Sequence, residues 1–405
     1  MTLIRPFPGL RPAAGRAEEV VAPPYDVLSS DEARLRAAGR PWSFLHISKP
    51  EIDLPGSTDP HAAEVYEKAA ENLQRMLQAG VLARDEKPFY YVYRLVMGTH
   101  SQTGLVAVAS VADYDTNRIR KHEFTRPDKE DDRVRQIEAL HAQTGPVLLA
   151  CRSDAGIDAT LAEVARGRPD VDLVADDGIG HSLWVVKDDV LIDKITADFD
   201  AMSALYIADG HHRSAAASRV AASHPDVESA GYFLTVIFPH RQMQILDYNR
   251  VVRDLGGMST EEFLARVAGS FTVSPVETSL RPDGPGIFGM YLAGQWYRLE
   301  IHADSIPNDP VGRLDVSILA DRLLAPILGI NDPRRDTRID FVGGIRGLAE
   351  LERRVDSGDM KVAFSMHPTS MEDLMSVADA GEVMPPKSTW FEPKLADGLV
   401  SHVLD

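Results

Sequence analysis

The residues best equipped for chemistry lie in one short turn. Asp209, Gly210, His211, His212 and Arg213 follow one another and bring together a carboxylate, two imidazoles and a guanidinium. The apolar run before them predicts a strand, and the alanine-rich run after them predicts a helix. The first N–H groups of a helix attract anions, glycine lets the backbone approach a ligand, and a guanidinium binds phosphate oxygens in pairs. The turn therefore predicts a phosphate site, and the alternative is an ordinary charged turn.

The side chains of this turn suit different tasks. Asp209 repels phosphate, so we expect it to serve a metal ion or a hydroxyl proton. His211 and His212 are adjacent, and neighbouring side chains on a helix point about 100° apart, so the two are poorly placed to bind one metal ion together.

A second polar stretch runs from Ile119 to Arg133 and leads into a predicted helix. Its cations are suited to gather a polyanion: Lys121, Arg126, Lys129 and Arg133. Its other polar groups suit a metal ion or a polarised hydroxyl: His122, Glu123 and Asp132. A run of charges is also typical of a solvated face, and this alternative stays open.

Two proline-rich segments present further polar groups. Pro23-Pro24 restricts the backbone before Tyr25 and Asp26, so that Asp26 leaves in a defined direction. A second such segment, near the C-terminus, carries groups that suit a phosphate or carboxylate partner: Lys387, Ser388, Thr389 and Lys394. The alternatives are a plain turn and an ordinary packed terminus.

The overall charge limits the classes of partner. The 405 residues carry a formal net charge of -18, which argues against general nucleic-acid or anionic-membrane binding but not against one small basic pocket. The single cysteine, Cys151, rules out an internal disulfide and lies in an apolar run that predicts a buried thiol. No apolar span of membrane length and no signal-peptide pattern occur, so we expect a cytoplasmic protein without membrane contact.

The pattern of elements favours an α+β (mixed α/β) fold. Helical apolar spacing covers His61–Gly80. Two apolar runs, Phe89–Val96 and Leu105–Ala112, predict strands of one hairpin, since glycines frame their connection. Antiparallel strands beside helices favour α+β over a doubly wound parallel sheet. The clearest helix predicted for the second half is Val311–Gly329.

Loop signals at Gly256-Gly257 and after Pro282 predict two regions. We expect residues 1–255 to hold the phosphate-donor site and residues 256–405 to form a mixed α/β region whose end, 384–394, returns to the site.

Several standard sites lack their sequence motifs. The chain has no Gly-x-x-x-x-Gly-Lys-Ser/Thr loop and no Gly-x-Gly-x-x-Gly after a strand. It also has no Gly-x-Ser-x-Gly elbow and no His-Glu-x-x-His helix. A phosphate site assembled from scattered segments remains, and it fits phosphoryl transfer, where catalysis depends mainly on positioning and charge neutralisation.

A series of short motifs resembles one family. In order they are Ile4-Arg-Pro-Phe-Pro-Gly-Leu-Arg-Pro, Ala22-Pro-Pro-Tyr-Asp-Val, Lys121-His-Glu-x-Thr, Lys129 with Asp132-Arg133, Ala208-Asp-Gly-His-His-Arg and Pro386-Lys-Ser-Thr-x-Phe-x-Pro-Lys. The series, from residue 4 to about 400, resembles the bacterial and archaeal family labelled domain of unknown function 1015 (DUF1015). That family is similar to the SerK-type free serine kinases, which have a ParB/sulfiredoxin-like nucleotide-binding fold and make O-phospho-L-serine.

The resemblance implies roles for named residues. Donor phosphates would be bound by Gly210, His211, Arg213 and Ser214, with His212 beside them as a catalytic residue. Asp209 would assist the serine hydroxyl or the metal, and Asp26 is the nearest match to the general base, although the kinases carry Glu there. The remaining family matches are assigned to substrate binding: Lys121, His122, Glu123, Arg133, Lys387, Ser388 and Thr389.

The resemblance also implies partners. The phosphoryl donor would be ATP, ADP or pyrophosphate, the acceptor L-serine, and Mg²⁺ the expected cofactor, with no nucleic acid as partner and a homodimer kept open as the assembly. Two other classes compete with the kinase: a non-catalytic nucleotide-binding regulator of the ParB-like type, and a phosphatase or nucleotide hydrolase that uses the same turn.

Overall fold

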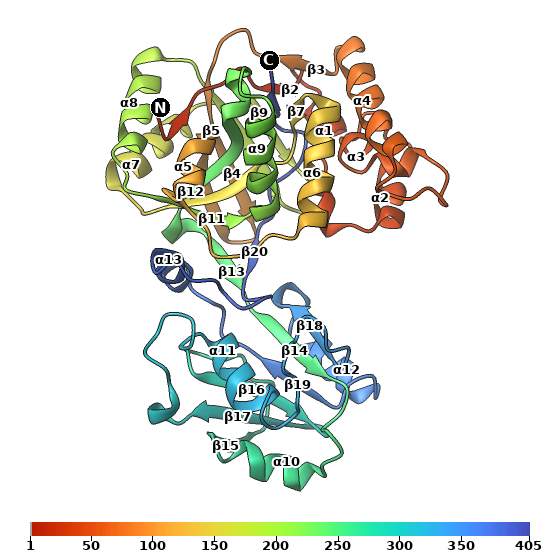
Figure 1. Ribbon diagram of the computed structural model, residues 1–405, viewed down its shortest axis with the longest axis vertical. Coiled ribbons are helices and arrows are strands. Elements are labelled where there is room, and N and C mark those ends of the chain that lie inside the picture. The colour runs from red at the N-terminus through yellow and green to blue at the C-terminus, as the bar shows by residue number, and fades with distance from the viewer. Residues whose placement is uncertain (1) are drawn as a thin grey trace. The chain divides into compact units, whose positions relative to one another are not determined.

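The computed structural model describes residues 2–405 and has a mixed α/β fold, which confirms the predicted fold class. It divides into two compact units (Figure 1). The first unit contains the chain up to Met243 together with Pro393–Asp405, and the second contains Gln244–Glu392. The division therefore falls about a dozen residues before the predicted boundary at 255, because Tyr248–Val252 pairs within the sheet of the second unit.

The first unit is built on a mixed sheet, nine-stranded within the described residues, in the order β6-β11-β8-β12-β5-β4-β10-β9 with β1 paired to β5. The pairs β8–β12 and β6–β11 are parallel, and the other pairs are antiparallel. The strands of this sheet are β1 Ile4–Arg5, β4 Tyr90–Met97, β5 His100–Ser110, β6 Ile119–Arg120, β8 Val147–Cys151, β9 Val171–Val174, β10 Gly180–Val186, β11 Leu205–Asp209 and β12 Tyr232–Pro239. Four short strands form two separate pairs: β2 Leu10–Pro12 with β3 Leu82–Arg84, and β7 Ala142–Gln143 with β21 His402–Val403.

Helices surround this sheet, and α9 lies beside α6 (Figure 1). The helices of the first unit are α1 Ala17–Val20, α2 Ser30–Ala37, α3 Leu45–Ser48, α4 Ala63–Gln78, α5 Val111–Asp115, α6 Pro127–Leu140, α7 Ala155–Val164, α8 Asp189–Asp200 and α9 His211–Ser223. Short 3-10 turns occur at Tyr25–Val27, Pro50–Asp53, Glu228–Gly231 and His240–Gln242.

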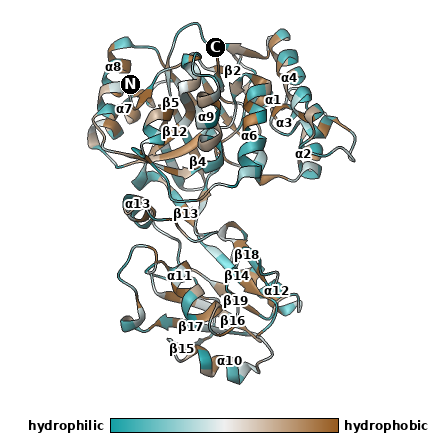
Figure 2. Cartoon of the chain, viewed as in Figure 1, coloured by the Kyte–Doolittle hydropathy of each residue, from teal (hydrophilic) through white to brown (hydrophobic). Residues whose placement is uncertain are grey.

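The central strands are buried on both faces, so β8, β11 and β12 are continuous apolar runs rather than alternating ones. The strands are accordingly hydrophobic in Figure 2, whereas polar residues mark the outer faces of the helices. Cys151 lies in β8 and is 1% exposed, and burial raises the pKa of its thiol to about 12. This confirms the predicted buried thiol.

The second unit has a six-stranded antiparallel sheet, counted within the described residues, in the order β15-β17-β16-β19-β14-β18. Its strands are β14 Tyr248–Val252, β15 Phe271–Val276, β16 Ile287–Leu292, β17 Gln295–Ile301, β18 Ile339–Gly343 and β19 Val362–Ser365, and β13 Gln244–Leu246 pairs with β20 Trp390–Glu392. Its helices are α10 Thr260–Val267, α11 Asp315–Leu319, α12 Leu348–Asp356 and α13 Met371–Asp379.

The local predictions agree with these elements except at one helix. The predicted helix His61–Gly80 is α4, and the predicted hairpin is β4 and β5. The predicted helix Val311–Gly329 is wrong in extent, because only Asp315–Leu319 is α-helical and Ala320–Leu324 continues as a π-helix. Pro326 follows two residues after Leu324, and a proline cannot donate the backbone N–H that a longer helix needs.

Among the described residues, no helix is both long enough and apolar enough to cross a membrane.

Candidate active site

The turn that begins the site is strand, glycine and helix, as predicted. β11 ends at Asp209, Gly210 adopts φ 97° and ψ 27°, and α9 begins at His211. A Cβ atom on Gly210 would lie 3.3 Å from the Cα of Val147 in the neighbouring strand and 3.2 Å from Nε of Arg213. Glycine is therefore required both by the left-handed backbone and by the close approach of β8.

The N-terminus of α9 has no side-chain cap. Within a helix the first N–H groups have no carbonyl partner, and they form the positive end of the helix dipole. The first turn of α9 carries no acidic residue that would compete with an anion. The start of α9 is thus suited to bind a phosphate or carboxylate.

Arg213 connects this helix start with two carboxylates. Its Nη2 lies 3.5 Å from Oδ2 of Asp26 and 3.8 Å from Oδ1 of Asp209, and Nη1 donates to the carbonyl of Pro146. Burial opposes the charged form of Arg213, but Asp26, Tyr25 and Asp209 together raise its pKa above the usual range. The guanidinium is therefore a permanent cation with a fixed orientation.

Asp209 pairs with a residue from the end of the chain. Nζ of Lys394 donates to Oδ2 of Asp209 at 3.3 Å. Burial would raise the pKa of Asp209, but Lys394 and Arg213 outweigh burial and lower this pKa to about 2. Asp209 is therefore ionised at neutral pH and is a weak proton acceptor.

A third carboxylate of this cluster, Asp397, is not among the site residues predicted from the sequence. It is 2% exposed, its Oδ2 accepts the N–H of Tyr25 at 3.2 Å, and its backbone forms an isolated bridge with Ala22. Burial raises its pKa to about 7 and Asp26 adds to the rise, while Arg213 opposes it. A carboxyl group that titrates near pH 7 has the acidity expected of a general acid or base.

These side chains line one small cavity. It has a volume of about 20 Å³ and is lined by Asp26, Asp209, Arg213, Lys394 and Asp397, among others. A larger cavity of about 280 Å³ shares Pro24, Lys394 and Leu395 with it. The charged cluster therefore lies next to a cavity that has room for a larger group.

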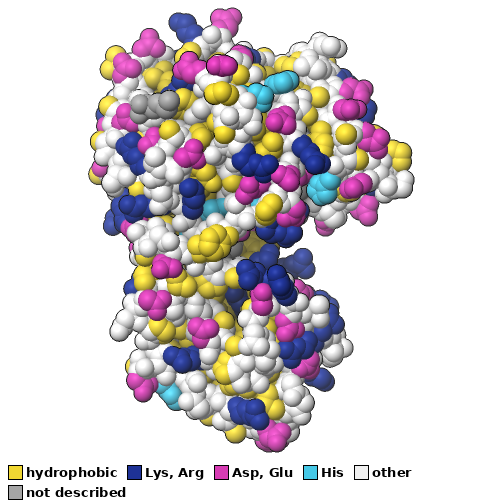
Figure 3. All heavy atoms as spheres, in the orientation of Figure 1, with side chains coloured by type: hydrophobic (Ala, Val, Ile, Leu, Met, Phe, Trp, Pro, Cys, Tyr) yellow, Lys and Arg dark blue, Asp and Glu magenta, His cyan; other side chains and the backbone are white. Residues whose placement is uncertain are grey.

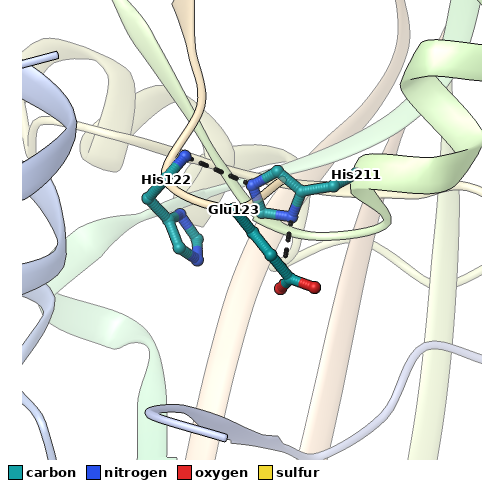
Figure 4. A group of neighbouring side chains, drawn as sticks. All are labelled: His122, Glu123 and His211. Carbon is teal, nitrogen blue, oxygen red and sulfur yellow. Dashed lines mark hydrogen bonds and ion pairs between the residues drawn. The ribbon is translucent and has the colours of Figure 1, made fainter. Parts of the chain in front are cut away.

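On the other side of the turn, two histidines face one another (Figure 4). The rings of His122 and His211 are T-shaped, with centroids 4.4 Å apart, and Nε2 of His211 accepts the N–H of His122 at 3.4 Å. Nδ1 of His211 lies 4.0 Å from Oε2 of Glu123. Burial lowers the pKa of His122 to about 4 and that of His211 well below the usual range, so both rings are neutral at pH 7.

His212 and Ser214 form hydrogen bonds with other residues of the first unit. Nε2 of His212 accepts the N–H of Arg126, the residue before α6, at 3.1 Å. The Ser214 hydroxyl is buried and donates to the carbonyl of His211 at 3.0 Å. This geometry does not support a bond from Ser214 to a donor, and the catalytic role of His212 stays a prediction.

Two cationic residues that were predicted to bind the substrate, Lys121 and Arg133, also have partners within the first unit. Nζ of Lys121 donates to the carbonyl of Tyr114 at 2.7 Å and lies 3.9 Å from the centre of its ring. Arg133 pairs with Asp132 at 2.5 Å and lies 4.1 Å over the ring of Tyr25. Arg133 therefore helps to position Tyr25, whereas Lys121 turns back toward α5.

Lys387, Ser388 and Thr389 belong to the second unit. Lys387 has φ 59°, its ammonium lies 5.6 Å from the centre of the Tyr248 ring, and its carbonyl accepts from Arg250 at 3.0 Å. The Ser388 hydroxyl donates to the carbonyl of Pro385. Their substrate-binding role stays a prediction.

Acidic and basic side chains are interspersed over the face of the first unit that Figure 3 shows. The local arrangement in the site, in which Arg213 and Lys394 stand against Asp26, Asp209 and Asp397, therefore matters more than the net charge.

The model of the family described as protein of unknown function (DUF1015) matches residues 4–317. The chain belongs to this family. The match covers the motifs from Ile4 to Arg213 and ends before Pro386–Lys394, which the sequence resemblance had included. No curated protein matches the chain.

Solved structures similar to this DUF1015 member have low sequence identity to it. A conserved hypothetical protein from Pyrococcus furiosus is 13% identical, with a TM-score of 0.35 over 73% of this chain and 94% of that one. A free serine kinase in complex with AMP is 12% identical, with a TM-score of 0.36 over 73% and 92%. SbnI from Staphylococcus aureus, truncated at its C-terminus, is 12% identical, with a TM-score of 0.37 over 73% and 86%.

Proposed function

We propose that this protein is a small-molecule kinase that transfers a phosphoryl group from ATP, ADP or pyrophosphate to the hydroxyl of free L-serine. The observation that carries the proposal is the meeting of Arg213, Lys394 and the uncapped start of α9 around three carboxylates. The resemblance of the Asp209–Arg213 motif to the phosphate-binding turn of SerK-type kinases supports the choice of substrate class.

The donor phosphates would bind at the start of α9. The backbone N–H groups of His211 and His212 would donate hydrogen bonds to the phosphate oxygens there, and Gly210 lets these oxygens come close to the backbone. Arg213 and Lys394 would offset the charge of the transferred group, which in phosphoryl transfer is the main task of the protein.

The acceptor hydroxyl must lose its proton as its oxygen attacks phosphorus. We assign Asp26 as the residue that accepts this proton, because its carboxylate is 41% exposed and lies beside Arg213. The new O–P bond forms as the bond between this phosphorus and the donor's bridging oxygen breaks, and that oxygen leaves with the rest of the donor. Asp397, which is buried and titrates near pH 7, would hold the backbone of Tyr25 and so position Asp26.

Asp26 and Asp209 supply the hard oxygen ligands that Mg²⁺ prefers, so the residues present fit this ion. When bound, it would neutralise charge on the donor phosphates. For the amino-acid part of the acceptor, Glu123 would pair with the ammonium and Arg133 with the carboxylate.

Phosphorus NMR with purified protein, magnesium and L-serine tests the proposal, with ATP, ADP and pyrophosphate run in parallel. We expect an O-phosphoserine resonance with at least one donor. Donor hydrolysis that is independent of serine would identify a hydrolase, and nucleotide binding without any product would identify a regulator.

A matched pair of variants locates the site. Arg213→Ala removes the cation that faces Asp26 and Asp209, so we expect donor affinity to fall at least tenfold. Arg219→Ala is the control, because Arg219 lies on the same helix and pairs with Glu130 and Asp131. Equal activity in the two variants would show that the turn takes no part in the reaction.

A further inference from the structure

The histidine pair beside the turn is placed as a set of metal ligands. One ligand atom each from His122, Glu123 and His211 lies within 4.8 Å of the other two (Figure 4). We propose that these three residues bind a divalent transition-metal ion of the Zn²⁺ type. The inference goes beyond the proposed function, in which Glu123 would contact the serine ammonium, and binding of the metal alone, without serine or nucleotide, tests it.

Strand pairing brings the three residues together. β6 and β11 are parallel, with Ile119 opposite Leu205 and Arg120 opposite Tyr206. Parallel strands end at the same edge of a sheet, so the residues that follow β6 emerge beside those that follow β11. His122 and Glu123 leave the first strand there, and His211 opens the helix after the second.

His122 has a buried ring nitrogen without a partner. The residue is 3% exposed, and its Nδ1 has no hydrogen-bond partner among the described residues. The ring also has a hydrogen bond to the backbone of Ile207, and since Nδ1 has no partner, we infer that Nε2 makes this bond and that Nδ1 carries a lone pair. Buried polar atoms are rarely unpaired in proteins, and a metal ion would supply the missing partner.

The donor set selects the class of metal. Two imidazoles with one carboxylate suit Zn²⁺, Co²⁺ or Ni²⁺, whereas Mg²⁺ prefers oxygen ligands alone. Imidazole binds such metals through a ring nitrogen lone pair, which the unpaired Nδ1 of His122 can supply. The two histidines and Glu123 therefore prefer a different metal ion from the one that the carboxylates around Arg213 prefer.

Binding requires two small adjustments. Metal coordination through Nδ1 of His211 moves the ring proton to Nε2, and the long 3.4 Å contact with the His122 N–H is then exchanged for the metal bond. Ligands around a tetrahedral Zn²⁺ lie about 3.4 Å apart, so atoms that are up to 4.8 Å apart must approach by up to about 1.4 Å. The Glu123 side chain is 55% exposed and can make this movement.

The test uses the full-length protein after treatment with a chelator, in the absence of any nucleotide. We expect equilibrium dialysis to show one equivalent of Zn²⁺ per chain, and Co²⁺ to give visible d–d absorption with nitrogen ligands. The Glu123→Gln variant should weaken Zn²⁺ binding at least tenfold, and the His122→Asn and His211→Asn variants should abolish it.

His402→Gln is the matched control, because His402 is equally buried and, within residues 2–405, also has an unpaired Nδ1 but belongs to no such group of ligands. Circular dichroism checks that each variant is folded, and Glu123→Gln keeps the test valid if a histidine variant is not. Absence of stoichiometric binding, or equal binding by wild type and Glu123→Gln, would overturn the proposal. A kinase without Zn²⁺ binding, or Zn²⁺ binding without a kinase, separates this inference from the proposed function.

Discussion

Lys394 and Asp209, 185 residues apart in the chain, form an ion pair of 3.3 Å in the first unit. The pair joins the C-terminal segment to the turn between β11 and α9. It keeps Asp209 ionised, and it places a second cation beside Arg213 in the same cavity. A residue near the end of the chain is thereby part of a site that begins at Asp26.

Replacing Lys394 should weaken donor binding. In the Lys394→Met variant the ammonium is lost and Asp209 faces Arg213 alone, so we expect the dissociation constant for ADP or pyrophosphate to rise about tenfold, which is the effect of one charge-assisted contact. Isothermal titration calorimetry measures this change. Lys187→Met, an exposed lysine of the same unit, is the control and should bind like wild type.

Replacing Asp209 should affect turnover more than donor affinity. Asp209→Asn keeps the shape of the side chain but removes the charge that pairs with Lys394 and lies near Arg213. We expect kcat to fall by about 10²-fold or more, while donor binding changes less because two cations then face the phosphates without a competing carboxylate. A loss confined to donor affinity would contradict the assignment.

Burial of Asp397 should make stability depend on pH. Its pKa is about 7 in the folded chain against about 3.8 in the unfolded one, so between these values the folded state binds more protons and stability falls as pH rises. The groups that face it include Tyr25, Asp26, Arg133 and Arg213. Asp397→Asn should therefore gain stability over wild type from pH 4 to pH 7, by up to about 4 kcal/mol, and the gain should level off above pH 7.

Urea unfolding of both proteins across this pH range measures the difference. A difference in the free energy of unfolding that stays constant with pH would show that folding does not raise the pKa of Asp397. The same variant separates the proposed roles of two carboxylates: if Asp397 only positions Asp26, Asp397→Asn retains measurable kinase activity, whereas Asp26→Asn does not.

The sequence indicated the turn well because its signals are local. A buried strand, a glycine and an alanine-rich helix lie within one stretch, and the structure has all three at the predicted residues. The contacts of Ser214 and Lys121 could not be predicted from the sequence, because residue type does not tell whether a hydroxyl bonds to its own helix or an ammonium to a nearby carbonyl. Asp397 escaped notice for another reason: its burial depends on the bridge to Ala22, a contact that no local pattern encodes.

Replacing Gly210 tests whether the turn is held by backbone conformation, by close packing, or by both. Gly210→Ala places a Cβ atom at φ 97° and 3.3 Å from the Cα of Val147, which is backbone and cannot turn aside. Gly178→Ala is the matched control, since Gly178 has φ 81° but nothing within 4 Å of the added Cβ.

The left-handed backbone alone costs on the order of 1–2 kcal/mol, so both variants should lose about that much. Packing against β8 should cost Gly210→Ala at least about 1 kcal/mol more, as overpacking of a core does. Thermal unfolding of the two variants measures the difference, and an equal loss would mean that β8 shifts to accept the methyl group. In that case the turn between β11 and α9 is adaptable, and donor affinity in Gly210→Ala should survive as well.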